Sequence, residues 1–277
     1  MTHRTISPEH ICSFRNHLLE EEKSPATLDK YLRDVRAFAS FAAGRPVSKE
    51  LVMDWKARLG LHGYAPRSIN SMLASLSSFL IYMGWGDCRV KSLKLQRRVY
   101  CPEAKELTKG EYRRLLSAAD QRMSLVMQTI CATGIRVSEL RFFTWEAVSR
   151  GEVVVRCKAK TRAILLPGKL RKLLLAYARR EGCACGPIFR APGGGPMDRR
   201  AIWAGMKALC RRAGVAPSKV FPHNLRKLFA RTFYAMEKDI AKLADLLGHS
   251  SIDTTRIYII STGTEHRKKI ERLDLLV

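Results

Sequence analysis

The chain has 277 residues, and 50 Lys and Arg against 25 Asp and Glu give it a net charge of +25. This basic excess is spread along the whole chain, which suits a long DNA or RNA footprint better than a membrane surface, where one amphipathic helix usually carries the charge. No apolar run is long enough to span a bilayer, and the polar amino terminus, MTHRTISPEHICSF, lacks the apolar segment of a signal peptide, so a cytoplasmic protein is expected.

The cysteine pattern gives no sign of a metal site. Eight cysteines are scattered along the chain, and Cys183-Ala-Cys185 is the only close pair. No second pair and no histidine follows it at zinc spacing. We therefore expect buried, reduced thiols, and neither a metal nor a cofactor.

Residues 1–86 predict a compact unit of four helices. Ser-Pro pairs begin the first two helices, and apolar residues recur at helical spacing until Gly84-Trp85-Gly86 ends the unit. Such a unit is either a plain helical bundle or a small clamp that lies on DNA. The expected helices span residues 7–22, 24 to the stop at 44, 48–59 and 65–83.

A basic stretch over residues 87–106 shows no clear period and is expected to be a linker. A second unit then begins at residue 107. Thr108 followed by Glu111 matches a capping box and predicts a helix to about residue 119. The next helix, up to residue 132, is apolar almost all round and is expected to be buried.

The break at Thr133-Gly134 predicts that a new helix begins over residues 135–140. Arg136 would lie at its N-terminal end, where free backbone N–H groups favour an anion. Glu139, three residues on, is either a brace for this guanidinium or an ordinary i,i+3 ion pair.

Residues 152–166, EVVVRCKAKTRAILL, are the only convincing β segment. Two strands flank a basic turn around Lys158-Ala159-Lys160. The hairpin either inserts a lysine beside a phosphate or carries exposed lysines for solubility. Further helices are expected over residues 169–181, 198–213 and 265–277.

Four reactive side chains gather in residues 221–260. His223 and Arg226 lie three residues apart in FPHNLRKLFARTFY and would share one helix face, and His249 and Tyr258 follow in LADLLGHSSIDTTRIYI. Each signal alone has a plain explanation: a surface polar pair, a helix C-cap or a half-buried tyrosine. Together, a nucleophile, a phosphate clamp and groups that move protons fit an attack on a phosphodiester.

Four stretches of the chain, taken in order, resemble the tyrosine recombinases, the integrase and Xer-like family: ATGIRVSEL, VVVRCKAKTRAILLP, FPHNLRKLFA and LGHSSIDTTRIY. The motifs cover residues 108–260, and a looser likeness covers residues 7–86. The resemblance implies a mainly α fold with a small β-sheet (α+β). A helical, SAM-like core-binding domain over residues 1–86 and a catalytic domain over residues 107–277 would form a C-shaped DNA clamp.

The resemblance also implies the groups that handle the phosphate. Tyr258 would attack the scissile phosphate and form a 3′-phosphotyrosyl link. Arg136 and Arg226 would clamp the non-bridging oxygens as charge builds on them. Glu139 matches the acidic residue that members often carry behind the first arginine, in a supporting role.

The same resemblance implies the groups that move protons. Lys158 best matches the acid that protonates the 5′-hydroxyl leaving group, and Lys160 stays an alternative because the hairpin register is open by a residue or two. His223 would assist proton transfer from the tyrosine. His249 would hydrogen-bond the phosphate.

Two positions depart from the family pattern. Members often have His directly after the second arginine, where this chain has Lys227, and Thr-His after the tyrosine, where it has Ile259-Ile260. Neither position carries the chemistry. The departures therefore bear on the subfamily and not on activity.

Such proteins act as tetramers on two DNA duplexes, pass through a Holliday junction and need neither ATP nor a metal. The resemblance implies a site-specific DNA recombinase that integrates or excises a mobile element or resolves chromosome dimers, with the tail over residues 264–277 docking on a neighbouring subunit. Two alternatives stay open. A type IB topoisomerase-like enzyme is disfavoured by the helical clamp and the tail, and a non-catalytic DNA-binding regulator is disfavoured by the complete set of candidate residues.

Overall fold

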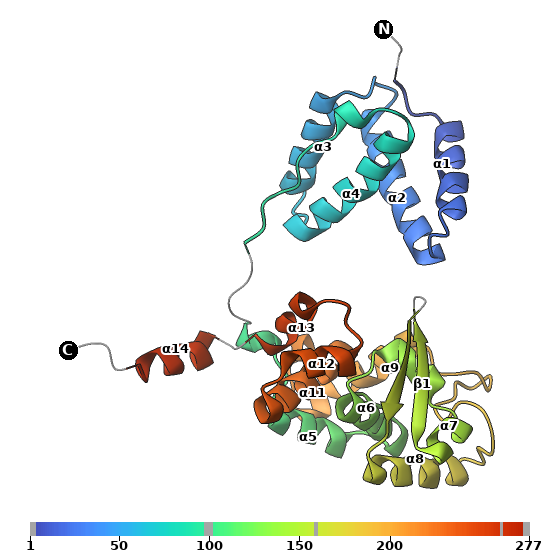
Figure 1. The fold of residues 1–277 in the computed structure, drawn as a ribbon, viewed down its shortest axis with the longest axis vertical. Coiled ribbons are helices and arrows are strands. Elements are labelled where there is room, and N and C mark those ends of the chain that lie inside the picture. The colour runs from blue at the N-terminus through green and yellow to red at the C-terminus, as the bar shows by residue number, and fades with distance from the viewer. Residues whose placement is uncertain (1–3, 97–101, 158–159, 261–262, 274–277) are drawn as a thin grey trace. The chain divides into compact units, whose positions relative to one another are not determined.

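The computed structural model describes residues 4–96, 102–157, 160–260 and 263–273. The chain divides into two compact units, Met1–Arg97 and Arg98–Val277 (Figure 1). Each unit has its own hydrophobic core. Both are mostly helical, and within the described ranges one two-stranded sheet supplies the β structure, so the predicted α+β class is confirmed. None of the helices in these ranges combines the length and apolarity that crossing a bilayer requires.

The N-terminal unit, over residues 4–96, contains four α-helices whose starts are set by the predicted caps. The side chains of Ser7, Ser24 and Ser48 each accept a backbone N–H from the following turn. Proline occupies the first turn of three of these helices, where its missing N–H costs nothing. The elements are α1 (Pro8–Glu20), α2 (Pro25–Ala42), α3 (Lys49–Leu61), α4 (Pro66–Tyr82) and the 3-10 turn η1 (Gly86–Cys88).

The apolar faces of these helices meet in one core that includes Phe14, Phe38 and Phe79. Asp34 is buried there and is only 1% exposed. Its carboxylate accepts hydrogen bonds from Lys30 Nζ and from Ser75 Oγ, each at 2.9 Å. A buried charge needs such partners, so this network joins α2 to α4.

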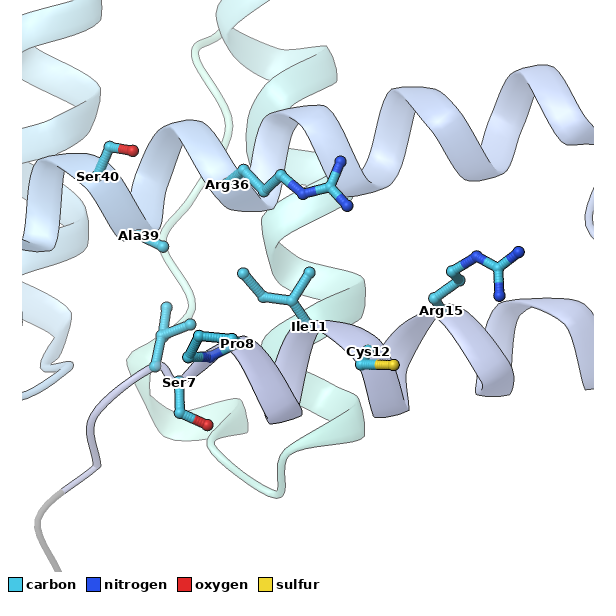
Figure 2. A pocket seen from close by; sticks show the side chains of 9 residues that line it. Ser7, Pro8, Ile11, Cys12, Arg15, Arg36, Ala39 and Ser40 are labelled. Atoms are coloured by element: carbon cyan, nitrogen blue, oxygen red, sulfur yellow. The ribbon is translucent and has the colours of Figure 1, made fainter.

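A pocket of about 470 Å³ opens between α1 and α2. Arg15 of α1 and Arg36 of α2 contribute their long side chains to it, and Ile11 forms part of its apolar wall (Figure 2). The two guanidinium groups give this face of the N-terminal unit a positive character.

The segment over residues 87–106, predicted to be a linker, contacts one unit at each end. Near its start, the Asn70 side chain exchanges two hydrogen bonds with the backbone of Leu93. Near its end, the Lys105 carbonyl accepts a hydrogen bond from Asn224 Nδ2 at 2.7 Å. Each end is thus fixed by a side-chain amide of the unit beside it.

The C-terminal unit is built around α6, whose residues are buried almost all round, as its apolar sequence predicted. Helices α5, α8, α9 and α11 all contact α6 (Figure 1). The elements are η2 (Glu103–Lys105), α5 (Lys109–Ala118), α6 (Gln121–Thr133), η3 (Val137–Phe142), α7 (Trp145–Arg150), β1 (Glu152–Cys157), β2 (Lys160–Leu165), α8 (Gly168–Arg180), α9 (Arg199–Ala208), α10 (Cys210–Ala213), η4 (Pro217–Lys219), α11 (Pro222–Glu237), α12 (Ile240–Leu247), α13 (Ile252–Ile259) and α14 (Gly263–Glu271).

Strands β1 and β2 pair antiparallel along their full length, so the predicted hairpin is confirmed. Val153, Val155 and Ile164 are buried against the core, as expected for residues that alternate along a strand. Of the predicted turn residues, Lys158 and Ala159 lie outside the described residues, and Lys160 begins β2 and does not belong to the turn.

The turn after α6 differs in part from its prediction. Gly134 adopts a left-handed conformation (φ +65°) and ends α6, but residues 137–142 form a 3-10 helix instead of the expected α-helix. Reciprocal bonds between Arg136 and Glu139 tighten this turn. Helix α7 follows from a cap at Thr144 and was not predicted, because six residues are too few to show a helical period.

The last described helix, α14, contacts α11 through an ion pair. Arg231 Nη2 lies 2.6 Å from Glu265 Oε1. Ile270 and Leu273, two of the three residues of the predicted apolar stripe, are 53% and 60% exposed. The third, Leu276, lies outside the described residues.

Candidate active site

Helix α11 begins with two of the predicted site residues. Phe221 is its N-cap and Pro222 occupies the first turn, so His223 and Arg226 both lie near the helix start. Arg226 is 1% exposed, whereas His223 is exposed. Both approach Tyr258: Arg226 Cζ lies 5.7 Å from the centroid of its ring, and the His223 ring lies 4.9 Å from it.

The buried Arg226 guanidinium is held by neutral groups. Nη1 donates to the Gly134 carbonyl at 2.6 Å, and Nη2 donates to the Leu247 carbonyl at 2.7 Å and contacts His249 Nε2 at 2.9 Å. Nε has no hydrogen-bond partner among the described residues. Burial, and then the charge of Arg136, lower the Arg226 pKa to about 10, so the group stays protonated at neutral pH. A buried cation that neutral groups hold favours an anion beside it.

Arg136 is braced by a buried carboxylate. Its backbone N–H donates to Glu139 Oε2 at 2.8 Å, and its Nη1 donates to Oε1 at 3.1 Å. Arg136 and Glu139 form the i,i+3 ion pair that their spacing allows, and Glu139 is 1% exposed. The Arg136 side chain is 39% exposed, so the carboxylate orients the guanidinium and leaves part of it open to a ligand.

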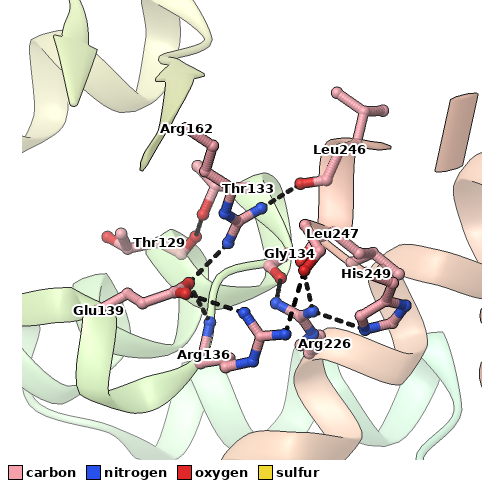
Figure 3. Close-up of polar contacts among 11 residues, drawn as sticks. Thr129, Thr133, Gly134, Arg136, Glu139, Arg162, Arg226, Leu246, Leu247 and His249 are labelled. Carbon is pink, nitrogen blue, oxygen red and sulfur yellow. Dashed lines mark hydrogen bonds and ion pairs between the residues drawn. The ribbon is translucent and has the colours of Figure 1, made fainter. Parts of the chain in front are cut away.

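Three successive carbonyls at the C-terminal end of α12 each accept a hydrogen bond from a different arginine (Figure 3). A helix end leaves these carbonyls without intrahelical partners, and the helix dipole gives them partial negative charge. The helix end therefore gathers three guanidinium groups that would otherwise repel one another. The pairs are Arg162 with Leu246, Arg226 with Leu247, and Arg136 with Gly248.

Arg162 of β2 was not predicted as part of the site. Its Nη2 donates to Glu139 Oε2 at 2.6 Å, and its side chain is 16% exposed. One signal in the sequence could have found it. Arg162 stands two residues before Ile164, on the strand face that the apolar residues mark as buried, and a charge at such a position needs a buried partner.

His249 lies between Arg226 and Thr255. Its Nε2 is 2.9 Å from Arg226 Nη2, and its Nδ1 is 2.9 Å from Oγ1 of the fully buried Thr255. Because arginine only donates, Nε2 accepts, and the neutral ring therefore carries its proton on Nδ1 and donates it to Thr255. Burial, followed by the charges of Arg226 and Arg136, lowers the His249 pKa to about 4, so the ring is neutral at pH 7.

Tyr258 of α13 is 8% exposed, and the two imidazoles flank its ring. The ring centroids of His223 and His249 lie 4.9 Å and 5.0 Å from that of Tyr258. His223 as a whole is exposed, but neighbouring groups partly desolvate its ring. This desolvation, followed by the charge of Lys227, lowers the His223 pKa. Tyr258 shares a small buried apolar cluster with Ala230, Leu243 and Leu247.

The structure brings together the predicted site residues that it describes. The hairpin lysine is the exception, because Lys158 lies outside the described residues and the side chain of Lys160 is not described. The choice between these two lysines stays a prediction. The residues that meet are Arg136, Glu139, His223, Arg226, His249 and Tyr258.

Comparison with known proteins bears on the whole chain. The sequence profile of the phage integrase family matches residues 105–265. The chain belongs to the phage integrase family. A profile of the N-terminal SAM-like domain of phage integrases matches residues 11–85, so the predicted SAM-like domain is confirmed. Within this integrase family the chain is a tyrosine recombinase, as its similar relatives are named.

One such relative is the tyrosine recombinase XerA of Thermococcus kodakarensis, which is 31% identical over 280 residues that cover 97% of this chain and 96% of the relative. Among solved structures, a lambda integrase dimer bound to a COC′ core site has a TM-score of 0.75 at 18% identity, covering 92% of this chain and 95% of the other. A lambda integrase tetramer bound to a Holliday junction has a TM-score of 0.72 at 18% identity, covering 92% and 77%. At such identity these integrase structures show the shared fold.

Proposed function

We propose that this tyrosine recombinase cleaves and rejoins DNA at specific sites through a 3′-phosphotyrosyl intermediate. The observation that carries the proposal is the buried Arg226, whose hydrogen bonds go to two backbone carbonyls and to His249 and whose Nε has no partner among the described residues. It lies 5.7 Å from the ring of Tyr258, which two imidazoles flank. A fixed cation beside a phenol and groups that move protons suits attack on a phosphodiester.

Arg226 and Arg136 would hold the non-bridging oxygens of the scissile phosphate. Backbone carbonyls and the carboxylate of Glu139 fix both guanidinium groups before any DNA arrives. Donors that are already in place stabilise the charge of the transition state without reorganising, and the loss of one such donor typically slows a reaction about 10²–10³-fold.

Tyr258 would supply the nucleophile. Its hydroxyl oxygen forms a bond to phosphorus while its proton passes to the neutral imidazole of His223, whose lowered pKa keeps it free to accept. The bond from phosphorus to the 5′ oxygen breaks, and that oxygen takes a proton from the ammonium group of Lys158. The products are a 3′-phosphotyrosyl link and a free 5′-hydroxyl.

His249 would respond to the bound phosphate. Its pKa is lowered by burial and by the cations around it, so an anion in the site acts in the opposite direction and raises that pKa. When a phosphate accepts a hydrogen bond from Arg226 Nη2, the bond from Nη2 to His249 Nε2 is lost. Nε2 can then gain a proton and donate it to a non-bridging oxygen.

Rejoining would reverse these steps. The 5′-hydroxyl of the same or of a partner strand attacks the phosphotyrosyl link, Tyr258 leaves, and its oxygen regains a proton. The link conserves the energy of the broken bond, so the scheme uses no ATP, metal or cofactor. Attack by a partner strand exchanges DNA ends, and repeated exchange passes through a Holliday junction.

We further propose a tetramer on two DNA duplexes in the cytoplasm. The net charge of +25 favours a polyanion, and Arg15 and Arg36 add cations on the N-terminal unit. The exposed Ile270 and Leu273 of the tail support docking on a neighbouring subunit. Deleting residues 264–277 should leave binding of one duplex intact and weaken assembly, and unchanged pairing of two duplexes by the shortened chain would contradict this.

The test begins with DNA sequences selected by binding to the full chain. A selected duplex with a nick beside the cleavage position lets the cut strand diffuse away, so a covalent adduct accumulates. Wild type should form the adduct, and Tyr258→Phe should bind the duplex without forming it. Tyr234→Phe, a change in the same apolar cluster, is the matched control and should form it. A wild type that binds tightly but never forms an adduct would favour a regulator, and one that only relaxes supercoils would favour a topoisomerase-like enzyme.

A further inference from the structure

Arg162 ties the β-hairpin to the rest of the site. It lies on β2 opposite the buried Val155, and its two terminal nitrogens reach different elements. Nη2 donates to Glu139 Oε2 of η3 at 2.6 Å, and Nη1 donates to the Leu246 carbonyl at the end of α12. One side chain thus joins β2, η3 and α12 (Figure 3).

Arg162 shares one partner with Arg136, and its other partner lies next to a group that holds Arg226. Glu139 also binds the backbone and the guanidinium of Arg136, and Leu246 directly precedes the carbonyl that holds Arg226. Gly248 leaves room for the Arg162 side chain because it has no Cβ. A Cβ added to it would lie 2.8 Å from Arg162 Cδ, so the guanidinium stem packs directly on the bare backbone of this turn.

Arg162 differs from its two neighbours in how its charge is used. Its guanidinium binds a carboxylate on one side and a helix-end carbonyl on the other, and its side chain is 16% exposed. Arg226 keeps an unused Nε, and the side chain of Arg136 is 39% exposed. Arg136 and Arg226 can therefore still bind a ligand. Arg162 instead holds protein segments together.

Core packing of Val153, Val155 and Ile164 holds the inner face of the hairpin, and Arg162 adds polar contacts to η3 and α12. These two strands form the whole sheet within the described residues, so no further strand there supports them. Lys158 precedes Arg162 by four residues, a span of at most about 13 Å in extended chain. The lysine therefore stands within that distance of a residue that contacts η3 and α12.

We propose that Arg162 is a positioning residue that anchors the hairpin so that its lysine reaches the leaving 5′ oxygen. The inference rests on the proposed function, in which Lys158 is the acid that protonates this oxygen. It assigns no contact between Arg162 and DNA. Arg136 and Arg226 keep their own hydrogen bonds when Arg162 is removed. Loss of Arg162 should therefore act on the protonation of the leaving group and spare the phosphate clamp.

The test uses two nicked duplexes that differ in one atom, with oxygen or sulfur as the bridging 5′ atom. A thiol has a pKa near 8.5, so a thiolate leaves without being protonated, whereas an alkoxide needs an acid. Arg162→Ala should cleave the oxygen duplex about 10²-fold more slowly than wild type, the scale expected of a misplaced catalytic group, and cleave the sulfur duplex within about 3-fold of wild type. Lys158→Ala should show the same pattern, and Arg136→Ala should be slow on both.

Three controls keep a folding defect apart from the proposed effect. Arg162→Lys retains the charge but only one of the two contacts, and should fall between wild type and Arg162→Ala on the oxygen duplex. Arg156→Ala removes an exposed arginine from the paired strand and should keep the wild-type ratio of sulfur to oxygen cleavage. Rapid cleavage of the sulfur duplex by a variant itself shows that the variant is folded.

The outcomes are distinct. If Arg162→Ala is equally slow on both duplexes, or cleaves both at the wild-type rate, the positioning role is wrong while the proposed function stands. If sulfur rescues Arg162→Ala but not Lys158→Ala, Arg162 positions a hairpin whose acid is Lys160, which Lys160→Ala checks. If wild type cleaves neither duplex, the proposed function fails and the inference fails with it.

Discussion

Replacing Gly134 by alanine should destabilise the C-terminal unit in proportion to two defects that the structure defines. Gly134 has a φ of +65°, a conformation that costs a residue with a Cβ about 1–2 kcal/mol. An added Cβ would also lie 2.4 Å and 2.6 Å from two ring atoms of Phe229 and 3.0 Å from Leu247. Forcing a packed ring aside costs about 1–3 kcal/mol, so Gly134→Ala should lower the free energy of unfolding by about 2–5 kcal/mol.

The same substitution should reduce cleavage in the protein that stays folded. The Gly134 carbonyl accepts the hydrogen bond from Arg226 Nη1 at 2.6 Å, and Leu247, the other clashing neighbour, provides the second carbonyl. A displacement of this turn therefore moves the buried guanidinium. Because errors of about 1 Å in a catalytic group slow reactions about 10²-fold, we expect a loss on that scale.

Gly151→Ala provides the matched control for the stability measurement. Gly151 also has a positive φ, +85°, but an added Cβ would meet only Arg171 atoms at 3.6 Å or more, an ordinary contact. It should cost only the backbone term of about 1–2 kcal/mol. Both glycines belong to the C-terminal unit, so urea unfolding of the two full-length variants measures the stability of the same unit. The difference between their free energies of unfolding isolates the contribution of the clash. Equal destabilisation by the two variants would refute the reasoning from packing at Gly134.

Three further predictions concern the site. The His249 ring should titrate near pH 4 in an NMR experiment. Because the same ring in the unfolded chain takes up its proton near the ordinary pKa of 6.5, the free energy of unfolding should fall as pH falls from about 6.5 to 4. His249→Gln should weaken this pH dependence. A midpoint near 6.5 in the folded protein would contradict the burial argument. Arg226→Lys should bind DNA but cleave it about 10²–10³-fold more slowly in the nicked-duplex assay, because an ammonium group does not reproduce the three directed contacts of the guanidinium. A cleavage rate reduced by less than tenfold would count against Arg226 as a clamp. Thr255→Val should slow cleavage up to about tenfold, the value of one hydrogen bond, by releasing Nδ1 of His249, and an unchanged rate would show that Thr255 does not orient the ring.

The helices of both units were predictable where the signal is local. Ser7, Ser24 and Ser48 cap helices within two residues of the predicted starts, and Thr108 forms the capping box with Glu111 that its spacing indicated. These signals need only a few neighbouring residues. The prediction was incomplete for the shortest elements: the six-residue α7 was missed, and η3 was expected to be an α-helix but is a 3-10 helix.

The membership of the site was predictable because side-chain identity and order are properties of the sequence. Arg136, His223, Arg226, His249 and Tyr258 stand in an order that fits one chemistry, and the fold brings them together. Their individual environments were not predictable from that order. Spacing placed two residues of α11 on one face, yet one of them is exposed and the other is 1% exposed.

By itself, the sequence determined which groups are available: the basic excess, the capped helices, the hairpin and the reactive side chains. Only the tertiary structure decided that three consecutive carbonyls at the end of α12 hold three arginines from β2, α11 and the turn before η3. Every residue has a carbonyl, so carbonyls leave no mark on a sequence. Which of them become binding groups depends on where a helix ends in space and on which distant segments the core brings to that end.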